Sequence, residues 1–219
     1  EIRNLKLETI PARFSKRGML IFSGVFIVVL LSWFLYLSPL LKFQAAKTWG
    51  DPSPEMMVIN GRAWLAENLN IPLDSMSWCY DDKAANCMKY GRLYTWENAR
   101  DACSFLGEGW RLPTNEEWSD LAMFAGGYYK WEVQDSVADP GKGFQSLAKG
   151  GNTGFNILLG GGRDIHGNFD FLEKLGAYWS GTESDSGYYF TYIFLGADSA
   201  LYQTVAPKES AAYCRCIKD

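Results

Sequence analysis

The sequence has a single histidine, His166, among 219 residues. No set of histidines and cysteines has the spacing of a zinc site, so we expect no metal centre of that kind. A Ser-His-carboxylate triad would have to use His166, which lies in a glycine-rich stretch where an exposed turn residue is the ordinary explanation. Residues 149–154 (KGGNTG) are not followed by Gly-Lys-Ser/Thr, which excludes a phosphate loop. The sequence therefore predicts neither catalytic residues nor a cofactor.

The chain also lacks a basic globular part. Its net charge is -4, and residues 1–17 carry five basic and two acidic side chains, so the remainder carries the excess negative charge. A protein that binds nucleic acid needs a basic face against the phosphates. We therefore expect no nucleic-acid partner.

Residues 18–41 contain no charged side chain. At about 1.5 Å per residue, a helix of this length crosses a hydrocarbon core of roughly 30 Å. A buried core helix would be shorter or amphipathic, and the apolar stretch of a cleaved signal peptide is usually about 7 to 15 residues long. Trp33 and Tyr36 stand near the far end, as in an interfacial aromatic belt. The pattern predicts a retained transmembrane signal anchor in the lipid bilayer.

The flanking charges predict the orientation of this anchor. Five Lys or Arg residues precede it, whereas only Lys42 and Lys47 follow closely. The positive-inside tendency places residues 1–17 in the cytoplasm and residues 57–219 outside it, on the periplasmic or extracellular side of a bacterial cell membrane. Residues 42–56 contain Asp-Pro-Ser-Pro and read as a short, stiff tether.

No cysteine precedes the predicted anchor. All five cysteines follow it, in the compartment where disulfides persist: Cys79, Cys87, Cys103, Cys214 and Cys216. An odd number leaves at least one thiol unpaired or paired between chains. Because Cys214 and Cys216 would point to the same face of a strand, either could take the same partner.

Local patterns in residues 57–219 indicate an α+β domain. Apolar runs at 57–59 and 62–64 flank Asn60-Gly61, which predicts a hairpin with a type I′ turn. Apolar spacing predicts one helix after Thr95, with its apolar face reaching Leu106, and a second from Thr114 to Ala125. Glu117 stands three residues after Thr114, as in a capping box. Closing antiparallel strands are expected at 177–180, 188–195, 201–205 and 211–217. The expected fold has two helices, a small irregular antiparallel sheet and long loops, including most of the stretch after Tyr128.

Several separate motifs occur in this domain in a specific order. They are residues 78–82 (WCYDD), 86–96 (NCMKYGRLYTW), 109–114 (GWRLPT), 117–118 (EW), 178–183 (YWSGTE) and 215–219 (RCIKD). Together they resemble the Fibrobacter succinogenes major paralogous domain (FISUMP), a module of surface and secreted proteins of Fibrobacterota and Bacteroidota. The resemblance covers about residues 55 to 219.

This resemblance implies a fold similar to C-type lectins and to the formylglycine-generating, sulfatase-modifying enzymes. It also implies the disulfides Cys79–Cys87 and Cys103–Cys216. The activity of the family is largely unassigned, so the resemblance predicts fold better than function. Two features depart from the family pattern: Cys214 is additional, and a spanning helix replaces the usual lipoprotein or cleaved signal.

Two metal chemistries follow from the related folds. Calcium needs clustered oxygen ligands, and Asp164, Asn168 and Asp170 are close in sequence, but a polar loop is the simpler interpretation. Copper-dependent oxidation needs a pair of thiolates. Cys214-Arg215-Cys216 suggests such a pair, yet Cys216 is the cysteine that the resemblance places in a structural bridge.

The aromatic residues offer the best candidate for a binding surface. Tyr128, Tyr129 and Trp131 fall outside any clear period, and we expect them to form an exposed patch, since surface rings stack on sugars or anchor protein interfaces. The expected function is that of a non-catalytic accessory subunit of an integral membrane protein complex. A carbohydrate- or cell-wall-binding surface module is the first alternative, and a copper-dependent oxidase is the second.

Overall fold

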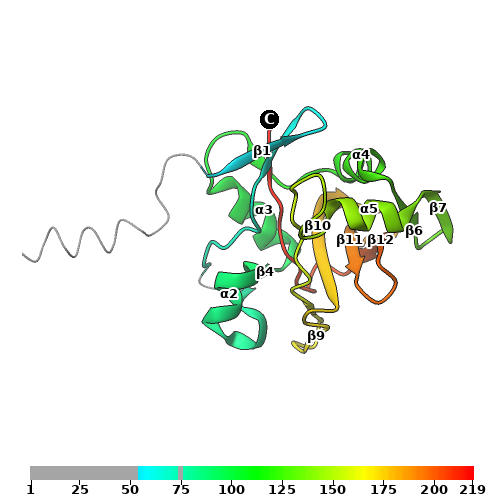
Figure 1. The fold of residues 1–219 in the computed structure, drawn as a ribbon. Coiled ribbons are helices and arrows are strands. Elements are labelled where there is room, and N and C mark those ends of the chain that lie inside the picture. Colours follow the sequence, from blue (N-terminus) through cyan, green and yellow to red (C-terminus); the bar gives the residue numbers. More distant parts are fainter. Residues whose placement is uncertain (1–53, 74–75) are drawn as a thin grey trace, which may run out of the picture. The chain divides into compact units, whose positions relative to one another are not determined.

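The computed structural model describes residues 54–73 and 76–219 (Figure 1). The predicted cytoplasmic segment 1–17, the predicted membrane span 18–41 and the tether up to residue 53 lie outside the described residues. Within these two ranges, no helix is both long enough and apolar enough to cross a membrane.

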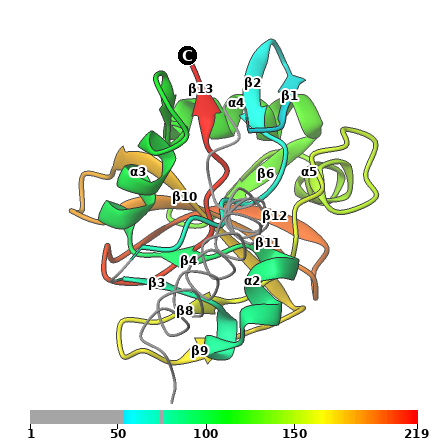
Figure 2. The same ribbon diagram turned by 90° about the vertical axis from the view of Figure 1, so that its left-hand side faces the viewer.

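The predicted hairpin is present and opens a four-stranded sheet. Strands β1 (Met56–Ile59) and β2 (Arg62–Leu65) pair antiparallel. Asn60 and Gly61 both have positive φ, 49° and 73°, as a type I′ turn requires. The sheet order is β1-β2-β13-β5, where β13 is Ile217–Lys218 and β5 is Trp110–Arg111. The strand nearest the C-terminus, drawn in red in Figure 2, therefore lies inside this sheet: the order of the strands places it between β2 and β5.

A five-stranded sheet forms the centre of the domain, with the order β10-β11-β12-β6-β7. Its strands are β10 (Leu175–Glu183), β11 (Tyr189–Leu195), β12 (Ala200–Ala206), β6 (Gly127–Lys130) and β7 (Asp135–Ala138). All pairs are antiparallel except β12 with β6, which run parallel. The predicted strand 211–217 contributes isolated bridges and β13 only. Two short ladders, β3 (Ser77–Trp78) with β4 (Leu93–Tyr94) and β8 (Gly162–Arg163) with β9 (Phe169–Asp170), complete the β-structure of the described part.

Both predicted helices are present, as α3 (Trp96–Ser104) and α4 (Asn115–Ala125). Thr114 and Glu117 form the predicted capping box: the Thr114 side chain accepts from Glu117 N at 3.2 Å, and the Glu117 carboxylate accepts from Thr114 N at 2.8 Å. Thr95 is the N-cap of α3, but its side chain makes no capping hydrogen bond.

The expectation of only two helices is wrong. A 3₁₀ turn η1 (Tyr80–Asp82) and the helix α2 (Ala84–Tyr90) lie in what reads as a loop, and α5 (Pro140–Leu147) lies in the glycine-rich stretch. Gly141 and Gly143 weaken the helical propensity of α5. Gly143 is needed because a Cβ there would lie 1.9 Å from the carbonyl oxygen of Gly127 on β6. The absence of a side chain at Gly143 allows α5 to pack closely on the sheet.

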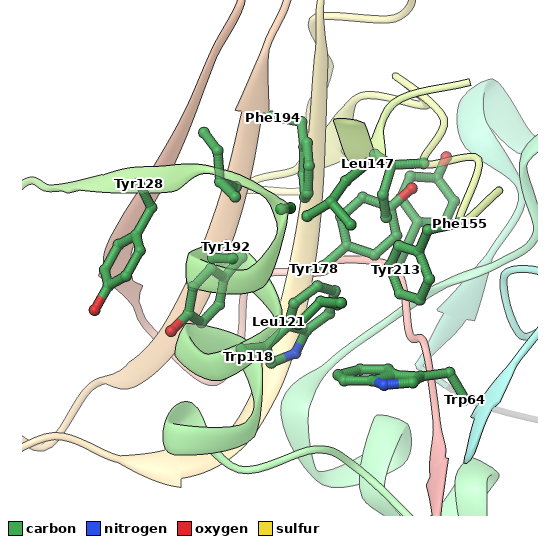
Figure 3. Packing of buried hydrophobic residues seen from close by; sticks show 14 of the residues in the cluster. Trp64, Trp118, Leu121, Tyr128, Leu147, Phe155, Tyr178, Tyr192, Phe194 and Tyr213 are labelled. Carbon is green, nitrogen blue, oxygen red and sulfur yellow. The ribbon is translucent and has the colours of Figure 1, made fainter. Parts of the chain in front are cut away.

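Helices α4 and α5 pack on one face of the five-stranded sheet and enclose the main core (Figure 3). Trp118 of α4 stacks on Tyr192 of β11, with ring centroids 5.1 Å apart, and Trp64 of the hairpin lies 5.2 Å from Trp118. These contacts join the four-stranded sheet to the larger one. A second core, around Trp179 and α3, covers the other face of β10.

Three motif tryptophans cross-link these layers through their indole N–H groups. Trp118 Nε1 donates to the carbonyl oxygen of Trp179 at 3.1 Å, and Trp179 Nε1 donates to that of Tyr94 at 2.8 Å. Trp96 Nε1 donates to the carbonyl oxygen of Ser180 at 2.9 Å. Buried indole N–H groups require hydrogen-bond partners. The structural role of these three tryptophans therefore accounts for their presence in the motifs.

Candidate functional site

The outer face of the five-stranded sheet is covered on one half and open on the other. One row of paired residues crosses this face: Ala177, Ile193, Tyr202, Tyr129 and Ser136. Ala177 and Ile193 belong to the second core or pack against it, whereas Ser136 is exposed. Tyr202 and Tyr129 therefore lie where the helical cover ends, on neighbouring strands.

These two tyrosines and Trp131 form what we call the aromatic cluster. The rings meet edge to face, with centroids 5.6 Å apart for Tyr129 and Tyr202, 5.8 Å for Trp131 and Tyr202, and 6.4 Å for Tyr129 and Trp131. The backbone N–H of Trp131 donates to the carbonyl oxygen of Gln203 at 2.9 Å, which fixes the residue beside β12. Trp131 is 60% exposed, so a large apolar side chain faces solvent in an ordered setting.

The predicted patch is wrong at Tyr128, which is only 4% exposed. Its side chain faces the main core, with its ring 6.2 Å from that of Tyr192 (Figure 3). Successive residues of a strand point to opposite faces, so Tyr128 and Tyr129 cannot both join one surface. The third ring of the cluster is Tyr202 instead. The sequence did not indicate this residue, because the parallel pairing of β6 with β12 joins segments that are distant in sequence.

Polar groups border the aromatic cluster. Tyr202 Oη donates to Asp198 Oδ2 at 2.8 Å, and burial together with the Asp198 carboxylate raises the pKa of Tyr202. Thr204 Oγ1 donates to Glu132 Oε1 at 3.1 Å. The surface thus offers three rings with carboxylates at its edge, which suits stacking and hydrogen bonding to a partner.

Both disulfides implied by the family resemblance are present, Cys79–Cys87 and Cys103–Cys216. Cys214 is a free thiol that is fully buried, and burial raises its pKa well above the ordinary value. A thiol in an apolar setting is unreactive, and Cys216 is already oxidised. Cys214 and Cys216 therefore do not supply the two thiolates that a copper site would need.

The loop around His166 is a compact polar turn. The Asp164 carboxylate accepts hydrogen bonds from the backbone N–H groups of His166 and Asn168 and from the Asn168 side chain. These bonds, the Asn168 side chain first, lower the pKa of Asp164. His166 is exposed, and Asp170 is part of β9. Across residues 54–73 and 76–219, no three His, Cys, Asp or Glu side chains gather as a metal site.

Comparison with known proteins identifies the domain but not its activity. No curated protein and no solved structure matches the chain significantly. The Fibrobacter succinogenes major domain matches residues 57–218, which include all described helices, both disulfides and every described strand except the first residue of β1. The chain therefore belongs to the Fibrobacter succinogenes major domain family.

Proposed function

We propose that this protein is a non-catalytic binding module, held at the outer side of a bacterial membrane, that serves as an accessory subunit of a membrane protein complex. The uncharged run 18–41 would hold it in the bilayer, with the basic residues 1–17 in the cytoplasm. The aromatic cluster would be its contact with the partner. The two disulfides agree with an oxidising compartment.

The observation that carries this proposal is the exposure of Trp131 beside the half-buried rings of Tyr129 and Tyr202, on the open half of the sheet. Tyrosine and tryptophan are enriched at interface hot spots because they bury much area with few rotatable bonds. The edge-to-face contacts of Trp131 with Tyr129 and Tyr202 restrain the ring before any partner arrives. A pre-ordered ring loses less entropy when it is buried in an interface.

A carbohydrate- or cell-wall-binding module is the second candidate. It is favoured by Asp198 and Glu132, whose carboxylates at the edge of the rings can accept hydrogen bonds from sugar hydroxyls. The proposed likeness of the fold to C-type lectins points the same way. Copper-dependent oxidation finds no comparable support, because Cys214 is buried and Cys216 is in a disulfide.

The full chain, tagged and expressed in its native host, provides the test. Purification in a mild detergent should co-isolate an integral membrane protein in stoichiometric amount. Trp131→Ala should release that partner, whereas Phe124→Ala, which removes an equally exposed ring on α4, should retain it. A wild-type chain that purifies alone contradicts the proposal. Glycan-array binding that is lost with Trp131→Ala would instead establish the second candidate.

A further inference from the structure

A hollow of about 690 Å³ lies away from the aromatic cluster. It is bordered by the start of β1, residues 66–70, the end of α2 and the loop between α5 and β8. Its apolar wall includes Met56, Met57 and Met88, and the amides of Asn68 and Asn156 supply polar groups. This volume lies within the range of small-ligand sites, and methionine side chains adapt to ligands of different shape.

Arg215, which also lines this hollow, is a buried cation. The residue is 1% exposed. Its Nε donates to Asn68 Oδ1 at 2.9 Å, its Nη1 to the carbonyl oxygens of Leu65 and Ala66 at 3.1 and 2.6 Å, and its Nη2 to that of Asn156 at 3.3 Å. The guanidinium also lies 4.6 Å from the ring centroid of Phe155. Every one of these partners is electrically neutral.

The charge of Arg215 is therefore not compensated by an ion pair. Among the described residues, no carboxylate comes within salt-bridge distance of it, although Glu67 at the edge of the hollow acts on it electrostatically. A guanidinium has five N–H groups, and the bonds above use four, which leaves one at Nη2. Burial lowers the pKa of Arg215 to about 10, so the group stays charged at neutral pH. An unpaired buried charge is costly, and an anion placed in the hollow would reduce that cost.

The other charged groups around the hollow form no ion pair with Arg215. Lys149 lines it, is exposed and forms no ion pair in the described part of the chain. Lys89 also lines it but is bound to Glu173 at 2.8 Å. Glu55 and Glu67 are the two acidic side chains of the lining. With Lys89 neutralised by Glu173, the two remaining cations, Arg215 and Lys149, equal the two carboxylates, so a ligand with one negative charge meets less repulsion than one with two.

We propose that this hollow binds a ligand with one carboxylate and an apolar tail, with the carboxylate toward Arg215 and Lys149 and the tail along the methionines. A free aliphatic acid and the C-terminal end of an apolar peptide share this chemistry. The site is formed by other residues than the aromatic cluster and does not depend on the function proposed for that cluster.

Calorimetric titration of the full chain in detergent tests the proposal, with chemical probes matched in shape. Hexanoate is compared with hexanamide, and an N-acetylated leucine dipeptide with a free carboxylate is compared with its amide. The carboxylate of each pair should bind about tenfold more tightly, because charge-assisted hydrogen bonds are about twice as strong as neutral ones. The tighter of the two carboxylates identifies the source as a small acid or a peptide end.

Exposed residues at the edge of the hollow provide variants that leave the fold intact. Lys149→Glu should weaken carboxylate binding several-fold, and Glu67→Gln should strengthen it about twofold. Lys142→Glu, on α5 and outside this hollow, makes the same charge change and should leave the affinity within twofold. The proposal is overturned if carboxylate and amide bind alike, if neither binds, or if Lys149→Glu and Lys142→Glu have equal effects.

Discussion

Arg111 binds Glu117 through two parallel hydrogen bonds, with Nη1 donating to Oε2 at 2.8 Å and Nη2 to Oε1 at 2.9 Å. Arg62 of β2 reaches the same carboxylate at 3.0 Å, and Asp219 Oδ1 accepts from Arg111 Nε at 2.9 Å. Glu117 also closes the capping box of α4. One buried carboxylate thus joins the hairpin, β5 and the start of a core helix.

We expect Glu117→Gln to lower the free energy of unfolding by about 1 to 3 kcal/mol at neutral pH, because it removes a charge that several donors share. The pKa of Glu117 is lowered below its ordinary 4.5, and the largest cause is the hydrogen bonding from Arg111. The stabilisation is therefore complete above the unfolded pKa and is lost as the pH falls through the folded one. The urea unfolding free energies of wild type and variant should start to converge as the pH falls below 4.5, and should meet once it has passed the folded pKa. Glu116→Gln, next to it but exposed, is the control; equal losses in both would contradict this role.

Trp179→Phe should lower the free energy of unfolding by about 2 to 4 kcal/mol, because it opens a cavity and removes one of the two donors to the Tyr94 carbonyl, the other being Ala212 N. Trp131→Phe should change it by less than about 0.5 kcal/mol, because the ring is mostly exposed. Chemical denaturation of the two variants compares the same substitution in a core and on a surface. Similar losses would show that Trp131 is part of the core.

The two disulfides should contribute unequally to the free energy of unfolding. Cys103–Cys216 closes a separation of 113 residues and Cys79–Cys87 one of only 8. In the chain-entropy account, the longer loop stabilises by about 2 kcal/mol more. Thermal unfolding of the two double Cys→Ala variants should therefore show the larger loss for Cys103 and Cys216. The reverse order would mean that local packing around α2 outweighs loop entropy.

Cys214 should resist alkylation in the folded protein, because burial raises the pKa of its thiol and shields it from the reagent. Iodoacetamide followed by mass spectrometry, without reductant, should label no cysteine under native conditions. In denaturant it should label Cys214 alone, since the other four are in disulfides. Rapid labelling of the native chain would restore the possibility of thiol chemistry.

Sequence patterns predicted the elements whose signals are local. The Asn60-Gly61 turn and the Thr114 capping box depend on neighbouring residues only, and both are present. For α5 a local signal existed and was missed: Asp139 accepts from the N–H groups of Gly141 and Lys142, and Pro140 takes the first turn. Gly143, a weak helix former, hid this signal, although the glycine is needed for the close contact of α5 with β6.

The candidate site depends on contacts that no local pattern contains. Tyr202 and Tyr129 meet because β12 and β6 pair in parallel across a long separation in sequence. Arg215 lies in a cysteine-containing motif, and its neutral partners Leu65, Asn68 and Asn156 come from two remote segments. Charge counting along the chain cannot show that such an arginine has no ion-pair partner, because pairing is decided by the fold.

The position of β13 has a consequence for how the domain is made. Ile217 pairs with both Trp64 and Arg111, so β2 and β5 are joined only through a strand that comes after every other element of the domain. Cys216, next to that strand, holds the long disulfide to Cys103. The four-stranded sheet cannot be completed while Ile217 is still inside the ribosome, so its closure waits until the last strand of the domain has emerged. Until then β2 and β5 have unpaired edges, during the interval in which a nascent chain is most open to chaperones and proteases.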